Sequence, residues 1–132
     1  MQDTLPIHFA PLQGYTEAIY RNAHDAFFGG VDTYYTPFVR LEKGNFRRRD
    51  VRGIEPENNG VPHLIPQLIA SSAEKAEVIL SLFIEKGYQE VDINLGCPFP
   101  LLAKRHNGSG ILPYPEEVKA LLSIVTRLSL IH

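Results

Sequence analysis

The sequence predicts an α/β fold in which strands and helices alternate around a parallel sheet. Two observations support this prediction. The chain has four short apolar runs rich in β-branched and aromatic residues, and most of the stretches between them have helical spacing of apolar residues with suitable capping residues. The apolar runs cover residues 7–12, 33–36, 64–69 and 91–95. Alternation of this kind is typical of βα units, whose parallel strands are buried on both faces.

The first predicted helix covers residues 17–28. Thr16 is a suitable N-cap residue, and Gly29 and Gly30 follow the last helical position. Three apolar residues recur every four positions and should face the core: Ile19, Ala23 and Phe27.

Residues 37–62 have no clear amphipathic period, so a helix there should be short, irregular or absent. Within this stretch, residues 40–52 carry six Lys or Arg and two Asp or Glu, a local net charge of +4 (six minus two). The rest of the chain then carries −6 (seven minus thirteen). In a βαβ arrangement, this basic segment leaves the carboxyl end of the second strand, where α/β folds bind ligands.

The two later segments have stronger helical patterns. Over residues 72–86, Ser71 and Glu74 have capping-box spacing and Gly87 ends the helix. The apolar stripe of this helix consists of Ala76, Ile79, Leu80, Phe83 and Ile84. Another helix begins at Pro115, a residue favoured in the first helical turn. Its expected buried residues are Val118, Leu121, Leu122, Val125 and Leu128.

Length and composition indicate one globular domain. The chain has 132 residues, of which 44% are hydrophobic and 21% charged. A net charge of −2 argues against a polycation that coats nucleic acid. The single cysteine excludes an intramolecular disulfide and a multi-cysteine zinc site, and it points to a reducing compartment. With no signal-like or membrane-spanning apolar run, we expect a cytoplasmic protein.

The segment Asp92-Ile-Asn-Leu-Gly-Cys-Pro98 has the highest density of chemically useful residues. At the end of a predicted strand, this segment has an amide side chain, a glycine, the single cysteine and a proline. Gly96 permits a tight backbone path, and Pro98 restricts the conformation of Cys97. Cys97 is therefore either a small packed hydrophobe or a reactive thiol that meets a ligand.

A reactive thiol has two possible uses. Nucleophilic catalysis would need a histidine base. The chain offers five histidines, of which His106 is nearest in sequence: His8, His24, His63, His106 and His132. Proton donation needs no such partner, because a cysteine thiol with a pKa of about 8.5 is protonated near neutrality. No histidine spacing predicts a metal site.

Two further features have both a functional and a structural interpretation. The Gly108-Ser109-Gly110 loop could cradle a phosphate, although it lacks the complete dinucleotide and P-loop patterns. Gln67 and Asn94 stand near the ends of neighbouring predicted strands. Together they could bind a flat heterocycle with imide edges, or they could satisfy loop backbone groups.

Taken together, these segments resemble the tRNA-dihydrouridine synthase family. The resemblance begins at Ala10-Pro-Leu-Gln-Gly-Tyr-Thr16 with Arg21, and it continues through Pro66-Gln67-Leu68. It is strongest over residues 92–98, followed by Lys104 and Gly108-Ser-Gly-Ile-Leu112. The resemblance implies a TIM (β/α)8-type barrel that binds FMN, accepts reducing equivalents from NADPH and reduces a uracil in tRNA. Full-length members are expected to act without a protein partner.

The resemblance also implies roles for individual residues. Cys97 would protonate carbon 5 of the uracil while a hydride reaches carbon 6. Pro11, Leu12 and Gln13 would lie along the flavin, and the amide of Gln67 would pair with its pyrimidine edge. Asn94 would contact the uracil or the flavin, and Lys104 the substrate or a phosphate. From charge alone, Arg47, Arg48 and Arg49 either meet tRNA phosphates or form a solvated basic face.

The sequence departs from the family pattern in four ways, one of which is Pro100, where some members have a lysine. Position 12 is Leu where the family usually has Met, and the segment Thr36-Pro-Phe-Val-Arg40 replaces a Thr-Glu-Met pattern. The chain also stops before the fifth strand of the barrel and the helical domain. We therefore expect residues 1–132 to form an N-terminal half-barrel of about four βα units, inactive or nearly so by itself.

Two alternatives remain at this point. One is another FMN barrel oxidoreductase, similar to dihydroorotate dehydrogenase. The other is a non-catalytic half-barrel that self-associates to cover its open sheet edges and inner face.

Overall fold

The computed structural model describes residues 4–128, which form an α/β structure with parallel strands. In chain order, the elements are β1 (His8–Phe9), α1 (Ala18–Phe27), β2 (Thr33–Tyr35), β3 (Leu41–Glu42), β4 (Asn45–Phe46), α2 (Arg48–Ile54), η1 (Pro56–Asn58), β5 (Leu64–Ile65), β6 (Gln67–Leu68), α3 (Ala73–Glu85), β7 (Asp92–Ile93), α4 (Pro100–Ala103), η2 (Gly108–Ile111) and α5 (Pro115–Arg127). No helix in this range is long and apolar enough to cross a membrane.

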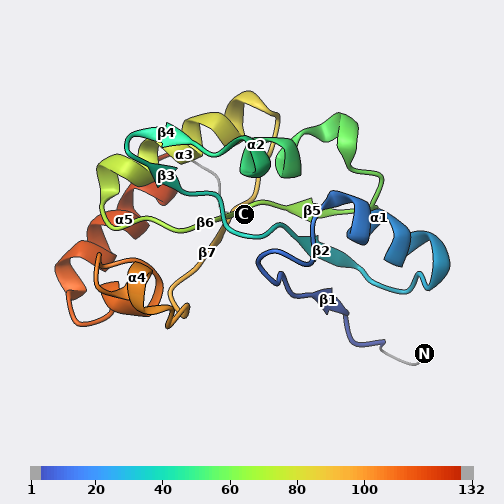
Figure 1. Ribbon diagram of the computed structural model, residues 1–132, viewed down its shortest axis with the longest axis horizontal. Coiled ribbons are helices and arrows are strands. Elements are labelled where there is room, and N and C mark those ends of the chain that lie inside the picture. The colour runs from blue at the N-terminus through green and yellow to red at the C-terminus, as the bar shows by residue number, and fades with distance from the viewer. Residues whose placement is uncertain (1–3, 129–132) are drawn as a thin grey trace.

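The parallel strands lie side by side in chain order. β1 pairs with β2, β2 with β5, and β6 with β7, all in parallel (Figure 1). The predicted strand at residues 64–69 is thus divided between two partners at Pro66, which has no backbone N–H to donate. The carbonyl of Pro66 still accepts a hydrogen bond from the Asp92 N–H at 3.0 Å. The predicted alternation of parallel strands and helices is confirmed.

The main core lies where α3 and α5 pack together against β6, Val39 and Ile54. Its buried members include Leu68, Val39 and Ile54. From the helices it takes Ala76, Ile79, Leu80, Phe83, Leu121, Ile124 and Val125. The helical stripe predicted for residues 72–86 is confirmed at four positions and wrong at Ile84, which is exposed.

The ends and faces of the helices require smaller corrections. Ser72, not Ser71, is the N-cap of α3, and its side chain accepts a hydrogen bond from the Lys75 N–H at 3.3 Å. In α5, Leu122 is exposed and Ile124 is buried, so the buried face is rotated from the predicted one. Val118 and Leu128 are partly buried against the core, as the pattern predicted.

The prediction for α1 is wrong about its buried face and its cap. Ile19 and Phe27 are 86% and 85% exposed, and the buried residues of α1 are Ala18 and Arg21. Ala23 is exposed as well. Apolar periodicity missed this face because a charged residue occupies its centre. Thr16 does not cap the helix: its hydroxyl accepts a hydrogen bond from the Leu12 N–H, which closes the turn before α1.

Arg21 connects α1 to the last turn of α2 and to Asn59 beyond it. Its guanidinium donates hydrogen bonds to the carbonyl oxygens of Thr16 (2.6 Å) and Gly53 (2.8 Å) and to Oδ1 of Asn59 (2.7 Å). The residue is fully buried, and burial lowers its pKa to about 10. Arg21 therefore stabilises this junction through oxygen acceptors that carry no full charge.

The stretch between β2 and β5 contains a short helix, one of the outcomes that its weak pattern allowed beside an irregular helix or none. α2 has seven residues and follows a hairpin of β3 and β4. Lys43 and Gly44 form the hairpin turn, both with positive φ, a conformation that glycine adopts readily. The hairpin itself was not predicted from the sequence, because each strand has only two residues.

Replacement of Arg21 by Met should destabilise the fold. Methionine keeps much of the side-chain length and removes the donors, so the Thr16 carbonyl and Oδ1 of Asn59 lose these hydrogen bonds at a buried junction. The Gly53 carbonyl keeps only the hydrogen bond from Nδ2 of Asn59. We expect the free energy of unfolding to fall by about 2 kcal/mol or more. Urea unfolding followed by circular dichroism would measure this loss. The control Arg105→Ala, at an exposed site, should change stability by less than about 0.5 kcal/mol. Equal stability of the two variants would contradict the role of Arg21.

Candidate functional site

Cys97 lies in the loop after β7, and its backbone is held from two sides. The side-chain oxygen of Asn94 accepts hydrogen bonds from the N–H groups of Gly96 (3.1 Å) and Cys97 (3.0 Å). The N–H and the hydroxyl of Ser109 both donate to the carbonyl oxygen of Cys97, each at 3.0 Å. These contacts fix the loop backbone while the thiol side chain remains partly exposed.

A chain of amide and carboxylate groups connects this loop to the sheet. Nδ2 of Asn94 donates to Oε1 of Gln67 at 3.0 Å, and Nε2 of Gln67 donates to Oδ2 of Asp92 at 2.5 Å. Because β6 and β7 are parallel neighbours, their polar side chains meet at one edge. The structure thus brings together the two amides that the sequence indicated, and Asn94 also serves the loop backbone.

The glycines of the 108–110 segment allow close packing against the Cys97 loop and α4. Gly108 has φ +57°, and a Cβ atom there would lie 2.7 Å from the carbonyl oxygen of Cys97. A Cβ atom on Gly110 would overlap the backbone carbonyl of Ala103. The segment thus has a packing function that the phosphate-loop interpretation did not include.

A cavity of about 340 Å³ opens beside Cys97. Its apolar part is formed by Phe38 and Leu102, which are buried together with Ile69 and pack against Cys97. Phe99 also lines the cavity and is 54% exposed. The remaining lining residues are Gln13, Arg40, Arg47 and Arg49. The partly exposed thiol therefore shares its cavity with aromatic and basic groups.

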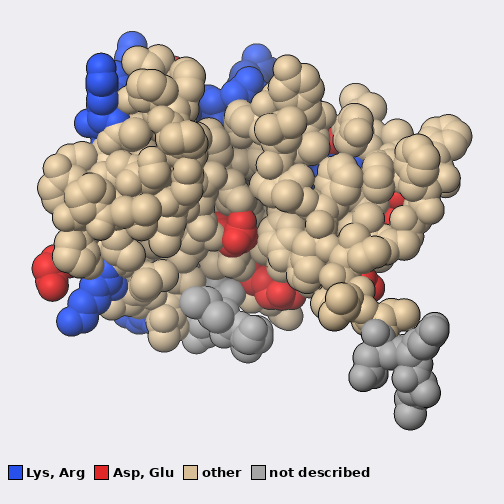
Figure 2. Space-filling model, turned by 90° about the horizontal axis from the view of Figure 1, so that it is seen from below, with Lys and Arg blue, Asp and Glu red and all other residues tan. Residues whose placement is uncertain are grey.

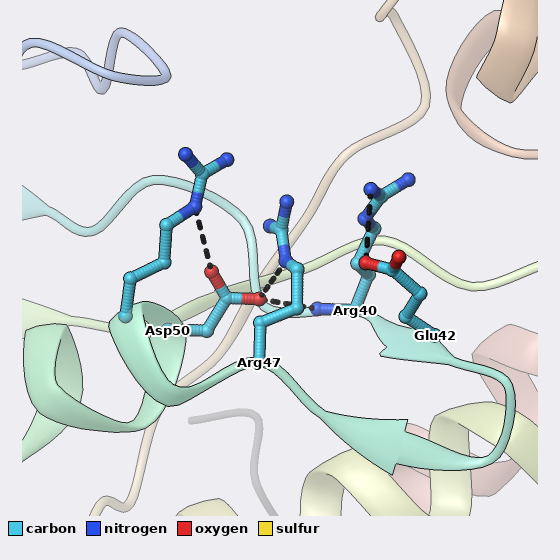
Figure 3. Close-up of polar contacts among 5 residues, drawn as sticks. Arg40, Glu42, Arg47 and Asp50 are labelled. Atoms are coloured by element: carbon cyan, nitrogen blue, oxygen red, sulfur yellow. Dashed lines mark hydrogen bonds and ion pairs between the residues drawn. The ribbon is translucent and has the colours of Figure 1, made fainter.

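The arginines of this cavity are organised around Asp50, whose side chain is only 4% exposed (Figure 3). Oδ2 of Asp50 lies 2.8 Å from Nε of Arg47 and accepts a hydrogen bond from the Arg40 N–H at 3.3 Å. Oδ1 lies 3.8 Å from Nε of Arg49. Burial raises the pKa of the Asp50 carboxyl, and the adjacent arginines, Arg47 first, oppose that rise.

Gln13 lies between the terminal nitrogens of two arginines. With its amide oxygen directed toward them, it accepts hydrogen bonds from Nη2 of Arg47 at 3.2 Å and Nη2 of Arg49 at 3.0 Å. The loop after β1 is thereby connected to α2. The cation of Arg47 also lies 5.9 Å from the centre of the Phe38 ring, close enough for a cation–π interaction.

Several residues singled out from the sequence lie outside this cavity. Arg48 and Lys104 are exposed and do not line it. Leu12 is exposed, and Pro11 is half-buried. Within residues 4–128, none of these four residues forms a hydrogen bond with Cys97.

The histidines are engaged elsewhere. His106 stacks on Tyr114 with ring centres 4.0 Å apart, and its Nδ1 lies 3.3 Å from a Glu117 oxygen. His8 and His24 each hydrogen-bond a tyrosine hydroxyl, and His63 pairs with Glu90. His132 lies outside the described residues. Within 4–128 no histidine is hydrogen-bonded to Cys97, and no group of three His, Cys, Asp or Glu side chains could hold a metal ion. The thiol geometry therefore does not support a Cys–His nucleophile in this part of the chain.

Sequence reasoning missed five residues of the site: Phe38, Arg40, Asp50, Phe99 and Leu102. The signal for Arg40 and Asp50 was present in the basic segment 40–52, where one of the two acidic residues proves to be buried. Phe38, Phe99 and Leu102 gave no signal of their own, because their place in the site depends on how distant segments pack. Ser109 lay in the loop considered for phosphate binding, but its hydrogen bonds to Cys97 were not predicted.

A sequence model of the family described as dihydrouridine synthase matches residues 8–128 of this chain. The chain belongs to the dihydrouridine synthase family. Its relatives include the probable tRNA-dihydrouridine synthase 1 of Synechocystis sp., which is 28% identical over 122 residues, covering 88% of this chain and 32% of that protein.

Shorter matches point to the same family. The tRNA-dihydrouridine synthase B of Klebsiella pneumoniae is 33% identical over 61 residues, which is 46% of this chain and 19% of that protein. The corresponding protein of Vibrio vulnificus is 37% identical over 60 residues, 46% of this chain and 16% of its own length. This family member therefore spans about a third or less of the length of these relatives.

Replacement of Gly110 by Ala should disrupt the packing of this dihydrouridine synthase family chain around Cys97. The added methyl group would overlap the Ala103 backbone, which no side-chain movement can relieve. We expect a loss of about 2 kcal/mol or more in unfolding free energy, measured by urea denaturation. Gly96→Ala is the matched control, because Gly96 directly precedes Cys97 and its Cβ position is open. If both variants lost the same stability, the packing role of Gly110 would be wrong.

Proposed function

We propose that this chain supplies the proton donor and part of the flavin and substrate sites of a tRNA-dihydrouridine synthase, an FMN-dependent enzyme reduced by NADPH. The observation that carries the proposal is the position of Cys97: a partly exposed thiol, fixed between Asn94 and Ser109, in a cavity with basic and aromatic walls. Family membership supports the reaction class, and the relatives named above are tRNA-dihydrouridine synthases.

The residues at the ends of β1 and β6 fit a flat ring with imide edges. Leu12 exposes an apolar side chain. Gln67 gives one of its two amide hydrogens to Asp92, and no other acceptor within residues 4–128 takes the second. We propose that Pro11, Leu12, Gln13 and Gln67 would hold the flavin. Bound there, FMN would supply the hydride that it receives from NADPH.

In this proposal, Cys97 completes the reduction of the uracil carbon 5–carbon 6 double bond. Carbon 6 receives the hydride, and Sγ of Cys97 gives its proton to carbon 5, so that one hydride and one proton are added in total. Solvent then returns a proton to the thiolate. Asn94 positions Cys97 through the backbone, and its remaining amide hydrogen is free within the described residues to meet the uracil or the flavin.

The proposed tRNA contacts use positive charge near this loop. Arg47, Arg48 and Arg49 follow β4, and Lys104 follows α4. Arg48 and Lys104 are exposed and could meet phosphates along a polynucleotide. The acceptor in this proposal is tRNA.

We further propose that residues 1–132 correspond to the N-terminal half of a barrel domain. The parallel strands in chain order, with α1, α2 and α3 after successive strands, support it (Figure 1). Most of the face seen in Figure 2 is uncharged, with Lys and Arg toward its edges and some Asp and Glu near its middle. On α1, Ile19, Tyr20 and Phe27 are exposed although helix residues of this type usually pack.

Replacement of Cys97 by Ala should abolish proton donation while flavin binding is retained. The test uses a chimera in which residues 8–128, the range that matches the family model, replace the corresponding segment of the Synechocystis relative. We expect dihydrouridine formation in tRNA to fall by about 10²-fold or more, the usual contribution of a positioned general acid.

Two controls accompany this experiment. Flavin absorbance of the purified chimera reports folding and cofactor retention, and Ser123→Ala, at an exposed position of α5, should leave the rate unchanged. Unchanged product formation by the Cys97→Ala chimera would remove Cys97 from the proposed role.

The exposed apolar side of α1 should cause the 132-residue chain to self-associate. We expect its mass, measured by light scattering after size exclusion, to rise above that of a monomer as concentration increases. The double variant Ile19→Glu and Phe27→Glu should reduce this association, whereas Ala26→Glu, also exposed on α1, should have a smaller effect. A chain that stays monomeric throughout would contradict the prediction.

A further inference from the structure

The hydrogen-bond chain between Asp92 and the Cys97 loop has a direction that both of its ends determine. At one end, the backbone N–H groups of Gly96 and Cys97 can only donate. At the other end, the carboxylate of Asp92 can only accept. The amides of Asn94 and Gln67 between these ends must therefore both turn their oxygen toward the loop and their nitrogen toward Asp92.

This direction determines which atoms the two amides leave free. Oδ1 of Asn94 accepts two hydrogen bonds, at 3.1 and 3.0 Å, so both of its lone pairs are used. Oε1 of Gln67 accepts one hydrogen bond, from Nδ2 of Asn94 at 3.0 Å. Each amide nitrogen gives one hydrogen to the hydrogen-bond chain and keeps one that no acceptor within residues 4–128 takes. The two amides therefore meet a ligand mainly as hydrogen-bond donors.

Asp92 takes part in the hydrogen-bond chain and, within residues 4–128, in no ion pair. It is the register partner of Gln67 on the neighbouring strand, and its Oδ2 accepts from Nε2 of Gln67 at 2.5 Å. Burial, and then the charges of Asp92 and Glu90, raise the pKa of the Tyr35 hydroxyl. The amide dipoles thus offset the charge of Asp92, and a charge at one end polarises the hydrogen bonds that follow it.

Gln67 is held so that its amide has little freedom. The residue is 7% exposed, and its backbone N–H donates to Oγ1 of Thr36 at 3.0 Å. Since a buried amide hydrogen without an acceptor costs free energy, the free hydrogen of Gln67 favours a ligand that supplies an acceptor. Asn94 is partly exposed and offers its own free hydrogen at the same edge of the sheet.

We propose that Asp92 is a positioning residue that makes this edge selective for a flat ring with hydrogen-bond acceptors on its rim. Asp92 holds the amide nitrogen of Gln67 in the orientation that matches Asn94, so that both amides donate to carbonyl oxygens or unprotonated ring nitrogens of the ligand. It acts through the amides and does not touch the ring. The identification of this ring as FMN rests on the proposed function.

The test exchanges the acid and the amide, with Asp92→Asn and Asn94→Asp in one double variant. The exchange keeps the net charge and the side-chain sizes, but it reverses the hydrogen-bond chain. The new amide at position 92 can donate to Gln67, and Gln67 can donate to the new carboxylate at position 94. That carboxylate can still accept the two N–H groups of the loop, so the loop contacts are retained.

The single and double variants should differ in stability. Asn94→Asp alone should lower the urea midpoint of the 132-residue chain by about 1 M, because Gln67 then lies between two carboxylates and can donate to only one. The double variant should regain most of this loss, since each amide and carboxylate again has a complementary partner. Circular dichroism measures both midpoints.

FMN binding should not recover with stability. In the chimera with the Synechocystis relative, freed of flavin, the dissociation constant for FMN is measured by quenching of flavin fluorescence. For the double variant it should stay about tenfold or more above that of the parent chimera, because the amide hydrogens no longer face the ring. Parent-like FMN affinity together with a restored urea midpoint would overturn the proposal, since the hydrogen-bond chain would then serve stability alone.

Two matched comparisons accompany the exchange. Asp92→Leu leaves Nε2 of Gln67 without its acceptor and should weaken FMN binding by about fivefold, whereas Asp92→Asn can still offer an oxygen and should keep the affinity. Equal FMN affinity of these two variants would contradict the role of Asp92. Asn45→Asp repeats the Asn94→Asp change at an exposed position of β4 and should leave both the urea midpoint and FMN binding unchanged.

Failure of this inference can be told from failure of the proposed function. If the parent chimera bound FMN and its dihydrouridine formation depended on Cys97, parent-like FMN affinity in the double variant would contradict only the role of Asp92. A parent chimera that bound no FMN would contradict the proposed flavin site, and with it the inference that rests on that site.

Discussion

The hydrogen-bond chain from Asp92 through Gln67 and Asn94 to the backbone of Cys97 is the interaction on which the site depends. It exists because β6 and β7 are parallel neighbours, so that polar side chains from both strands come to one edge. Each link uses a different donor and acceptor, and a buried Gln67 has few other ways to satisfy its amide. The direction of the Cys97 loop is thus set by the pairing of the sheet.

The segment between β2 and β5 adds the charge that this loop lacks. A regular long helix would spread its arginines around a cylinder, whereas the β3–β4 hairpin and the short α2 bring Arg40, Arg47 and Arg49 to one carboxylate. Asp50 contacts the guanidinium groups of Arg47 and Arg49 and the N–H of Arg40. Its carboxyl is buried, and this burial raises its pKa. The resulting cluster reaches the cavity of Cys97 and connects to the β1 loop through Gln13.

The sequence predicted those parts of the architecture that depend on local periodicity or on the order of parallel strands. The stripe of α3 follows helical periodicity, and Asn94 and Gln67 meet because parallel strands share their ends. The rule failed for α1, since a buried arginine that satisfies its donors with distant carbonyl groups has no apolar signature. It also failed for the arginine cluster, whose shape depends on a hairpin of four paired residues and on one buried acid. Long-range hydrogen bonding, not local preference, decided these positions.

The position of the single cysteine has a practical consequence for the study of this chain. Cys97 is partly exposed, and its backbone is fixed by Asn94 and Ser109, so a reporter group attached to Sγ would start from one defined backbone position. Because the sequence holds no other thiol, such labelling needs no prior removal of competing cysteines. The same atom that makes the loop chemically interesting thus offers a unique attachment point for a spectroscopic probe inside the cavity.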